Sequence, residues 1–268
     1  MNQHSLLSLS KVTFFCVQFS LFAQCFADAQ AHLLKNNDEC DLQLVADVYP
    51  GAQKWYQTMV AKYPQASLEK IQFGISDNYE SGQGIIFFPE WRLRDMQQVF
   101  GSVHPLRFTE EMFVAFAQEE WLLLHEAAHV LKNDTYHGAV AITATTGLMT
   151  SMVLACACAQ NYNKLKTSTG ILTVACTAAV GYAALILYGR FQESRADDFA
   201  NQNADAQALK AGKSWFDRLN TLMNFENISI PDFLNSFSHF LQDPIHPTPK
   251  SRALKVLQAL IIRFGQIA

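Results

Sequence analysis

The stretch His125-Glu126-Ala127-Ala128-His129 decides how the rest of the chain is interpreted. Its two histidines are four residues apart, so on a helix they lie on one face, one turn apart, and can reach one metal ion. Glu126 is displaced by about 100° around the helix axis, so it can lie beside the metal and exchange a proton with water. Zinc suits two imidazoles and one carboxylate with the fourth position open. A surface helix with two histidines would show the same letters, so other segments must support the interpretation.

The motif lies in a predicted long helix that begins at Thr109 and ends near Asn133. Thr109 is a good N-cap residue, and Glu110 and Glu111 suit the positive end of the helix dipole. Periodicity predicts helices over 47–63, 90–100, 190–211, 214–224, 230–241 and 251–264, and short strands over 68–75 and 85–88. The sequence therefore predicts a mainly α fold with a small β-sheet.

Two apolar stretches follow the motif, Gly138 to Ala159 and Gly170 to Gly189, and neither contains a charged residue. Each has about the 20 residues that a helix needs to cross a membrane. Both are rich in small residues, which favour close helix contact in lipid. A buried helical hairpin in a soluble fold is the alternative, but soluble helices rarely run this long without a charge. We therefore expect a two-helix transmembrane hairpin.

The short loop between these stretches predicts their orientation. It carries Lys164 and Lys166 and no acidic residue, which places it in the cytoplasm by the positive-inside rule. The flanking polar segments then face the other side of the membrane. The stretch from Val12 to Ala27 follows Lys11 and predicts a secretory signal peptide, or else an uncleaved anchor, which agrees with an exported main domain.

A third metal ligand is expected after the second apolar stretch. Glu193 is the candidate, and Asp197 lies one turn further on the same face, where it could hold the distal N–H of a ligating histidine. An ordinary charged helix face would look similar. The segment from His246 to Arg252 is by itself a proline-rich turn that opens a helix. The net charge of −4 and the absence of a long basic run argue against nucleic-acid binding.

Together these segments resemble the HtpX and CAAX-prenyl-protease family of zinc endopeptidases, of the gluzincin type. That family carries His-Glu-x-x-His, then Glu-x-x-x-Asp, then His-Pro-x-x-x-x-Arg, and this chain has all three in order. The resemblance implies a zincin-like catalytic domain that the membrane hairpin interrupts. It covers the chain from about residue 68 to its C-terminus.

The resemblance also implies roles for residues. It implies one zinc ion per subunit, held by His125, His129 and Glu193, with Glu126 as the catalytic residue. It further implies catalytic-site roles for Asp197, His246 and Arg252. Two roles are open for His246, which could donate to the oxyanion or could occupy the open zinc position and hold the enzyme inactive. The strand over 85–88 resembles the edge strand that aligns an extended substrate, or is an ordinary core strand.

These expectations divide the chain into six segments. They are a signal peptide at 1–27, the first half of the zinc peptidase domain at 28–137, a membrane helix at 138–160, a cytoplasmic loop at 161–169, a second membrane helix at 170–189, and the second half of the peptidase domain at 190–268.

The expected function is hydrolysis of peptide bonds in misfolded or membrane and envelope proteins, in protein quality control. The expected location is the bacterial inner membrane with the catalytic domain facing the periplasm, although HtpX itself has a cytoplasmic site; a eukaryotic organelle is the alternative. The expected partners are polypeptide substrates and membrane lipid. Two other functions stay open: a chaperone or assembly factor for envelope proteins with a latched zinc site, and a membrane interaction protein with a fortuitous motif.

Overall fold

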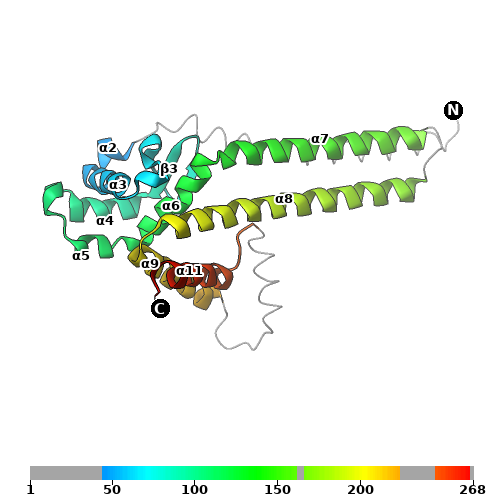
Figure 1. Cartoon of the computed structure of the whole chain (residues 1–268). Helices are drawn as coiled ribbons and strands as arrows, with labels where there is room; N and C mark the ends of the chain where they lie inside the picture. Colours follow the sequence, from blue (N-terminus) through cyan, green and yellow to red (C-terminus); the bar gives the residue numbers. More distant parts are fainter. Residues whose placement is uncertain (1–43, 162–165, 224–244, 266–268) are drawn as a thin grey trace. The chain divides into compact units, whose positions relative to one another are not determined.

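The computed structural model of the chain describes residues 44–161, 166–223 and 245–265 (Figure 1). The predicted signal peptide and the helix predicted over 230–241 lie outside these residues, as does Lys164. The described residues fall into two compact units. Tyr136–Leu185 belongs to one of them, and the other, called the main unit below, falls within Leu42–Thr135 and Ile186–Ala268.

Helices make up most of the described chain. The α-helices are α2 Val45–Val48, α3 Pro50–Lys62, α4 Glu90–Phe100, α5 Glu110–Val114, α6 Ala117–Leu131, α7 Asp134–Asn161, α8 Thr167–Asn203, α9 Ala206–Met223 and α11 Pro249–Phe264. The strands are β1 Gln72–Ser76, β2 Glu80–Gly82 and β3 Ile85–Pro89, and short 3₁₀ helices span Pro64–Ala66, Leu68–Lys70 and Pro105–Arg107. The predicted fold class, mainly α with a small β-sheet, is confirmed.

The sheet of the main unit has the strand order β1-β3-β2. Strand β3 pairs parallel with β1 and antiparallel with β2, so it is the central strand. The prediction that residues 85–88 form an edge strand is therefore wrong, and the alternative of a core strand holds. The physical reason is composition, because Ile86 and Phe88 are fully buried on one face of the sheet and Ile85, on the other face, is only 8% exposed. Among the described strands, β2 is the edge that lies against α6.

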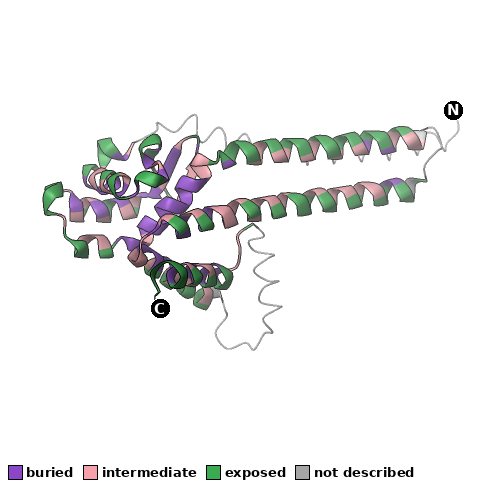
Figure 2. Ribbon diagram, in the orientation of Figure 1, coloured by how far each residue is buried: buried purple, intermediate pink, exposed green. Residues whose placement is uncertain are grey.

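Helix α6 runs through the middle of the main unit and is buried along most of its length (Figure 2). Its apolar residues pack against α9, β2 and β3. Trp121 is fully buried, and the Cα of Gly212 in α9 lies so close to it that an added Cβ would come within 2.9 Å of the indole ring. Close packing of this kind fixes the rotation of α6 about its axis.

The predicted helix that carries the motif is divided in two by a break at Phe116. Phe113 and Phe116 both pack against Phe100, with ring centroids 5.4 Å and 5.5 Å away. Arg92 donates a hydrogen bond from Nη2 to the carbonyl oxygen of Ala115 at 2.8 Å. A side-chain donor on this carbonyl and the aromatic cluster together favour a turn over a continuous helix.

Strand β1 begins later than the strand predicted over 68–75. The hydroxyl of Tyr56 donates to the carbonyl oxygens of Leu68 and Ile71, at 2.8 Å and 2.9 Å. These bonds hold a 3₁₀ turn where alternation alone suggested a strand, and the strand begins only at Gln72.

The helix boundary near residue 205 also differs from its prediction. The helix predicted over 190–211 is divided, and the helix predicted over 214–224 is part of α9. Asp205 is the cause, because its Oδ1 accepts a hydrogen bond from the backbone N–H of Ala208 at 2.8 Å and so caps a new helix.

The second unit contains most of α7 and the first part of α8, while the rest of α8, from Ile186 onward, belongs to the main unit. In this unit an added Cβ on Gly181 of α8 would come within 2.9 Å of Thr145 in α7, so small residues line their contact. Both helices are long and apolar enough to cross a membrane, over Asp134–Gln160 and Ser168–Asn203, and only 6% and 11% of their most apolar windows are buried. Such exposure does not fit the core of a soluble protein and points to membrane association (Figure 2).

Candidate metal centre

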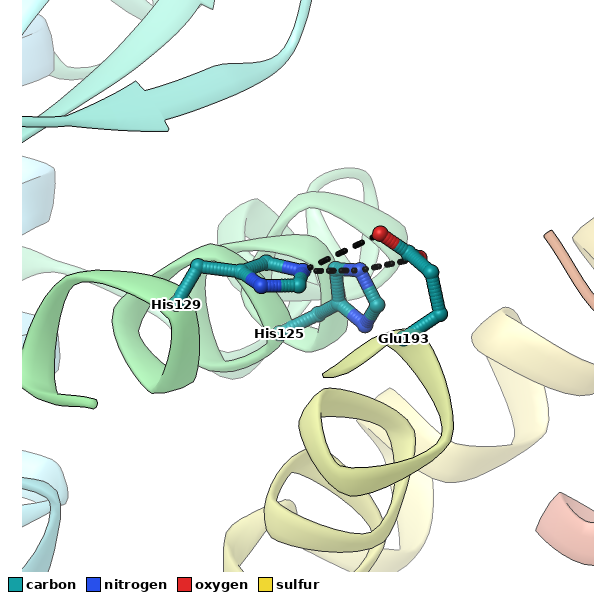
Figure 3. Close-up of side chains that lie close together, drawn as sticks. All are labelled: His125, His129 and Glu193. Atoms are coloured by element: carbon teal, nitrogen blue, oxygen red, sulfur yellow. Dashed lines mark hydrogen bonds and ion pairs between the residues drawn. The ribbon is translucent and has the colours of Figure 1, made fainter. Parts of the chain in front are cut away.

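Helix α6 brings His125, Glu126 and His129 to one side of the main unit. The Nε2 atoms of the two histidines are 3.3 Å apart (Figure 3). Trp121 stacks on the ring of His125, with centroids 5.4 Å apart and an interplanar angle of 21°. The indole is itself held, because its Nε1 donates to Oδ1 of Asn201 at 3.0 Å. The orientation of the His125 ring is therefore set by packing as well as by the helix.

Glu193 of α8 faces the two imidazoles. Its Oε2 lies 3.4 Å from Nε2 of His125, and its Oε1 lies 3.4 Å from Nε2 of His129 (Figure 3). One ligand atom from each of the three residues falls within 4.8 Å of the others. Oε2 of Glu193 is buried and accepts no hydrogen bond from any residue that the structure describes. Two nitrogens and one carboxylate oxygen in this arrangement fit a zinc ion with a fourth position open.

Each histidine is held from behind by a second carboxylate. Asp197 of α8 lies 3.0 Å from Nδ1 of His125, and Asp134 lies 2.8 Å from Nδ1 of His129. A carboxylate accepts, so each Nδ1 has to donate its hydrogen, which leaves each Nε2 as the nitrogen that can bind a metal in place of a proton. The tautomer that a metal requires is thereby favoured at both rings.

Asp134 is a site residue that sequence reasoning missed, as is Ser81, described below. Asp134 is 6% exposed and follows His129 by five residues, a spacing that does not place it on the same helical face. The structure brings it back because Asn133 adopts the left-handed conformation, with φ of 54°, between α6 and α7. An Asn-Asp pair directly after a predicted helix end was the available signal.

Arg252 of α11 lies behind the site and does not line its pocket. Its Nη2 donates to Oδ1 of Asp197 at 2.5 Å, and its guanidinium lies 4.5 Å from the ring centroid of Phe216. The residue is 8% exposed. Arg252 reaches the site through Asp197, which uses the same oxygen to approach His125, and also directly, because its Nη2 lies 3.5 Å from Nδ1 of His125.

A pocket of about 270 Å³ opens over the histidines. It is lined by Tyr79, Ser81, His125, Glu126, His129, Asp134, Thr135, Glu193 and His246. The carboxylate of Glu126 accepts a hydrogen bond from the Ser81 hydroxyl at 2.7 Å, so β2 fixes its orientation. His246 precedes α11, and its Nε2 lies 3.4 Å from Oε2 of Glu193. All of the residue types needed for metal-assisted hydrolysis meet in this one pocket.

The pocket is lined by the carboxyl groups of Glu126, Asp134 and Glu193. Burial lowers the pKa of His125, but the carboxylates of Asp197 and Glu193 outweigh burial and raise it to about 9. Burial beside the Glu119 carboxylate also raises the pKa of Tyr79 well above its usual value. A site that stabilises a proton on a buried imidazole so strongly also favours a bound divalent cation.

Two histidines one turn apart, a neighbouring glutamate and a carboxylate from a second helix define a metal-dependent peptidase. A protein-family model described as Peptidase family M48 matches residues 116–258, and the chain belongs to this family. Family M48 peptidases depend on zinc, so the protein is a zinc metalloendopeptidase. The matched residues include the motif of α6 and the Glu193 segment. No curated protein and no solved structure gives a significant match.

Proposed function

We propose that this protein is a membrane-associated endopeptidase in which His125, His129 and Glu193 hold one zinc ion. The observation that carries the proposal is the approach of their three ligand atoms to within 4.8 Å of one another, in the pocket that Glu126 also lines. Zinc bound there would supply a Lewis acid for the scissile carbonyl and lower the pKa of water.

Glu126 is the proton carrier in this proposal. Its carboxylate takes a proton from the attacking water and delivers it to the nitrogen of the leaving amine. Ser81 holds one carboxylate oxygen at 2.7 Å, so the other is directed into the pocket. Asp197 keeps His125 in the tautomer that leaves Nε2 free, and Arg252 holds Asp197 in place.

The proposed substrates are extended segments of misfolded or membrane and envelope proteins, as in protein quality control. Strand β2 supports an extended substrate, because it is an edge strand of the described sheet and Ser81 at its centre lines the pocket. A peptide added beside it would gain backbone hydrogen bonds without dependence on side-chain sequence.

The proposed location is the bacterial inner membrane, with α7 and α8 as its spans and the main unit in the periplasm. The two lysines of the loop between the spans, Lys164 and Lys166, support this orientation. A reporter fused in this loop is expected to be cytoplasmic, and a periplasmic reporter would overturn the topology.

The test of the enzymatic proposal compares the wild type with Glu126→Gln on an unfolded protein, with and without a chelator. Glu111→Gln, an exposed acid outside the pocket, is the matched control. We expect cleavage to be lost in E126Q and in the chelated wild type and kept in E111Q, because removing a proton carrier costs about 10²–10⁴-fold. Cleavage that survives both treatments would overturn the assignment of Glu126 and of the metal.

A latched site is the second candidate, and the position of His246 favours it. With its Nε2 3.4 Å from Oε2 of Glu193, the imidazole lies where it can compete for the open zinc position or donate to the oxyanion. The variant His246→Ala separates these roles. Higher peptidase activity indicates that His246 latches the zinc site, as in a chaperone-like state, whereas lower activity indicates that it donates to the oxyanion. Unchanged activity would exclude both.

A further inference from the structure

Asp134 has contacts on both sides of its carboxylate and on its backbone. Oδ2 accepts from Nδ1 of His129 at 2.8 Å, while Oδ1 forms an ion pair with the guanidinium of Arg195. Its backbone carbonyl oxygen accepts a hydrogen bond from Nε2 of Gln192 at 3.1 Å. The side chain of Asp134 is 6% exposed, so these bonds replace most of its hydration.

Apart from His129, these partners of Asp134 come from the same turn of α8 that carries Glu193. Gln192 precedes Glu193 by one residue, and Arg195 follows it by two. The turn of α8 that carries Glu193 therefore also binds Asp134, the first residue of α7. His129 and Glu193, from two different helices, are thus linked by a chain of contacts that does not pass through the metal.

The other histidine has an equivalent but separate arrangement. His125 is held by Asp197, which is held by Arg252 of α11. Asp197 belongs to the motif that the sequence shows, whereas Asp134 and Arg195 belong to no part of the proposed mechanism. One carboxylate and one arginine therefore stand behind each ring.

We propose that Asp134 is a positioning residue for His129, and that Arg195 acts through Asp134 to hold it in place. The proposal rests on the zinc site described under the proposed function. A carboxylate behind a ligating imidazole orients the ring and raises its basicity, and loss of such a group typically lowers metal affinity by about 10–100-fold. Arg195 has no ligand role, so its effect on zinc requires Asp134.

The test measures zinc affinity by competition with a chromogenic chelator, on the full chain in detergent micelles. We expect Asp134→Ala to weaken binding by about 10–100-fold and Arg195→Ala by a smaller factor, with Arg195→Lys restoring part of the loss. Asp198→Asn is the matched control, because Asp198 is an exposed acid on the same helix that pairs with Lys255. It is expected to bind zinc as the wild type does.

The double variant D134A/R195A distinguishes a positioning role from a merely structural one. If Arg195 acts through Asp134, the double variant binds zinc no more weakly than D134A alone. Additive losses would overturn the role given to Arg195. Asp134→Asn keeps the side-chain volume and provides a folded variant if D134A does not fold, and it is also expected to bind zinc more weakly than the wild type.

The two proposals fail in different ways. Wild-type affinity in D134A and D134N would overturn the positioning role, while the E126Q and chelator results would still stand. A wild type that binds no zinc would overturn the proposed function and this inference with it. A second readout is kinetic: at saturating zinc, a displaced His129 is expected to lower kcat in D134N and leave KM unchanged.

Discussion

Removal of the charge of Asp197 is expected to destabilise the main unit strongly, because it leaves a buried arginine without its counter-ion. The side chains of Asp197 and Arg252 are only 2% and 9% exposed. Breaking a buried ion pair by removing one partner costs about 3–5 kcal/mol. The ring of Phe216, 4.5 Å from the guanidinium, still stabilises the cation, so we place Asp197→Asn near the lower end, at about 3 kcal/mol.

The second arm of this experiment removes the other partner. Arg252→Met is expected to cost a similar amount, about 3 kcal/mol, because Asp197 then keeps His125 as its remaining polar contact. Replacing both members of a buried pair is often nearly neutral. The double variant D197N/R252M is therefore expected to be no less stable than the less stable of the two single variants. The coupling free energy should then reach at least about 3 kcal/mol.

The assay is urea unfolding of the full chain in micelles, followed by tryptophan fluorescence, with a chelator present throughout so that zinc affinity does not enter. Asp198→Asn is the matched control. Its pair with Lys255 joins the same two helices at 3.3 Å, but the side chains are 55% and 35% exposed, so its loss should cost less than about 1 kcal/mol. Additivity of D197N and R252M within about 0.5 kcal/mol would refute the reasoning.

Three further predictions concern residues around α6. Gly212→Ala would place a Cβ 2.9 Å from the buried Trp121 ring, so we expect a loss of about 1–2 kcal/mol in urea unfolding, and an unchanged midpoint would contradict this. Burial raises the pKa of Glu120 from 4.5 to about 7 despite Lys62. The folded state therefore binds the proton of this carboxyl group more tightly than the unfolded state does, and the unfolding free energy falls as pH rises from about 4.5 to about 7. Glu120→Gln should therefore gain up to about 3 kcal/mol relative to wild type between pH 4.5 and 7, while a relative loss would show that the ion pair dominates. Ser81→Ala removes the donor 2.7 Å from the motif glutamate, and should lower kcat by about tenfold at unchanged zinc content; an unchanged kcat would exclude the orienting role.

The spacing of residues along the sequence was sufficient to predict those pairs of site residues that lie on one helix. The four-residue spacing of His125 and His129, and of Glu193 and Asp197, depends only on helix geometry. The pairing of these two segments rested on the position of Glu193 after the second apolar stretch and on a resemblance, because no local pattern indicates which helix faces which. Their approach in the structure depends on long-range packing that α6 makes with its neighbours.

The features that sequence reasoning missed depend on contacts between distant residues. Tyr56 turns residues 68–71 into a 3₁₀ helix by hydrogen bonds from another element. Strand β3 is central because two other strands pair with it, and alternation cannot distinguish an edge from a centre. Asp134 reaches His129 only through the left-handed turn at Asn133, which a helical pattern does not reveal.

Several charged residues buried around α6 form ion pairs that connect different helices. Four acids on or beside this helix are each paired with a cation from another helix: Glu119 with Arg92, Glu120 with Lys62, Asp197 with Arg252 and Asp134 with Arg195. Apolar residues of similar volume would often give equal or greater stability, so stability alone does not account for these pairs. Directional pairs do what apolar contacts cannot, because they fix rotation and register. Helix α6 is held on several sides by such pairs, and its histidine face has little freedom to turn away from Glu193.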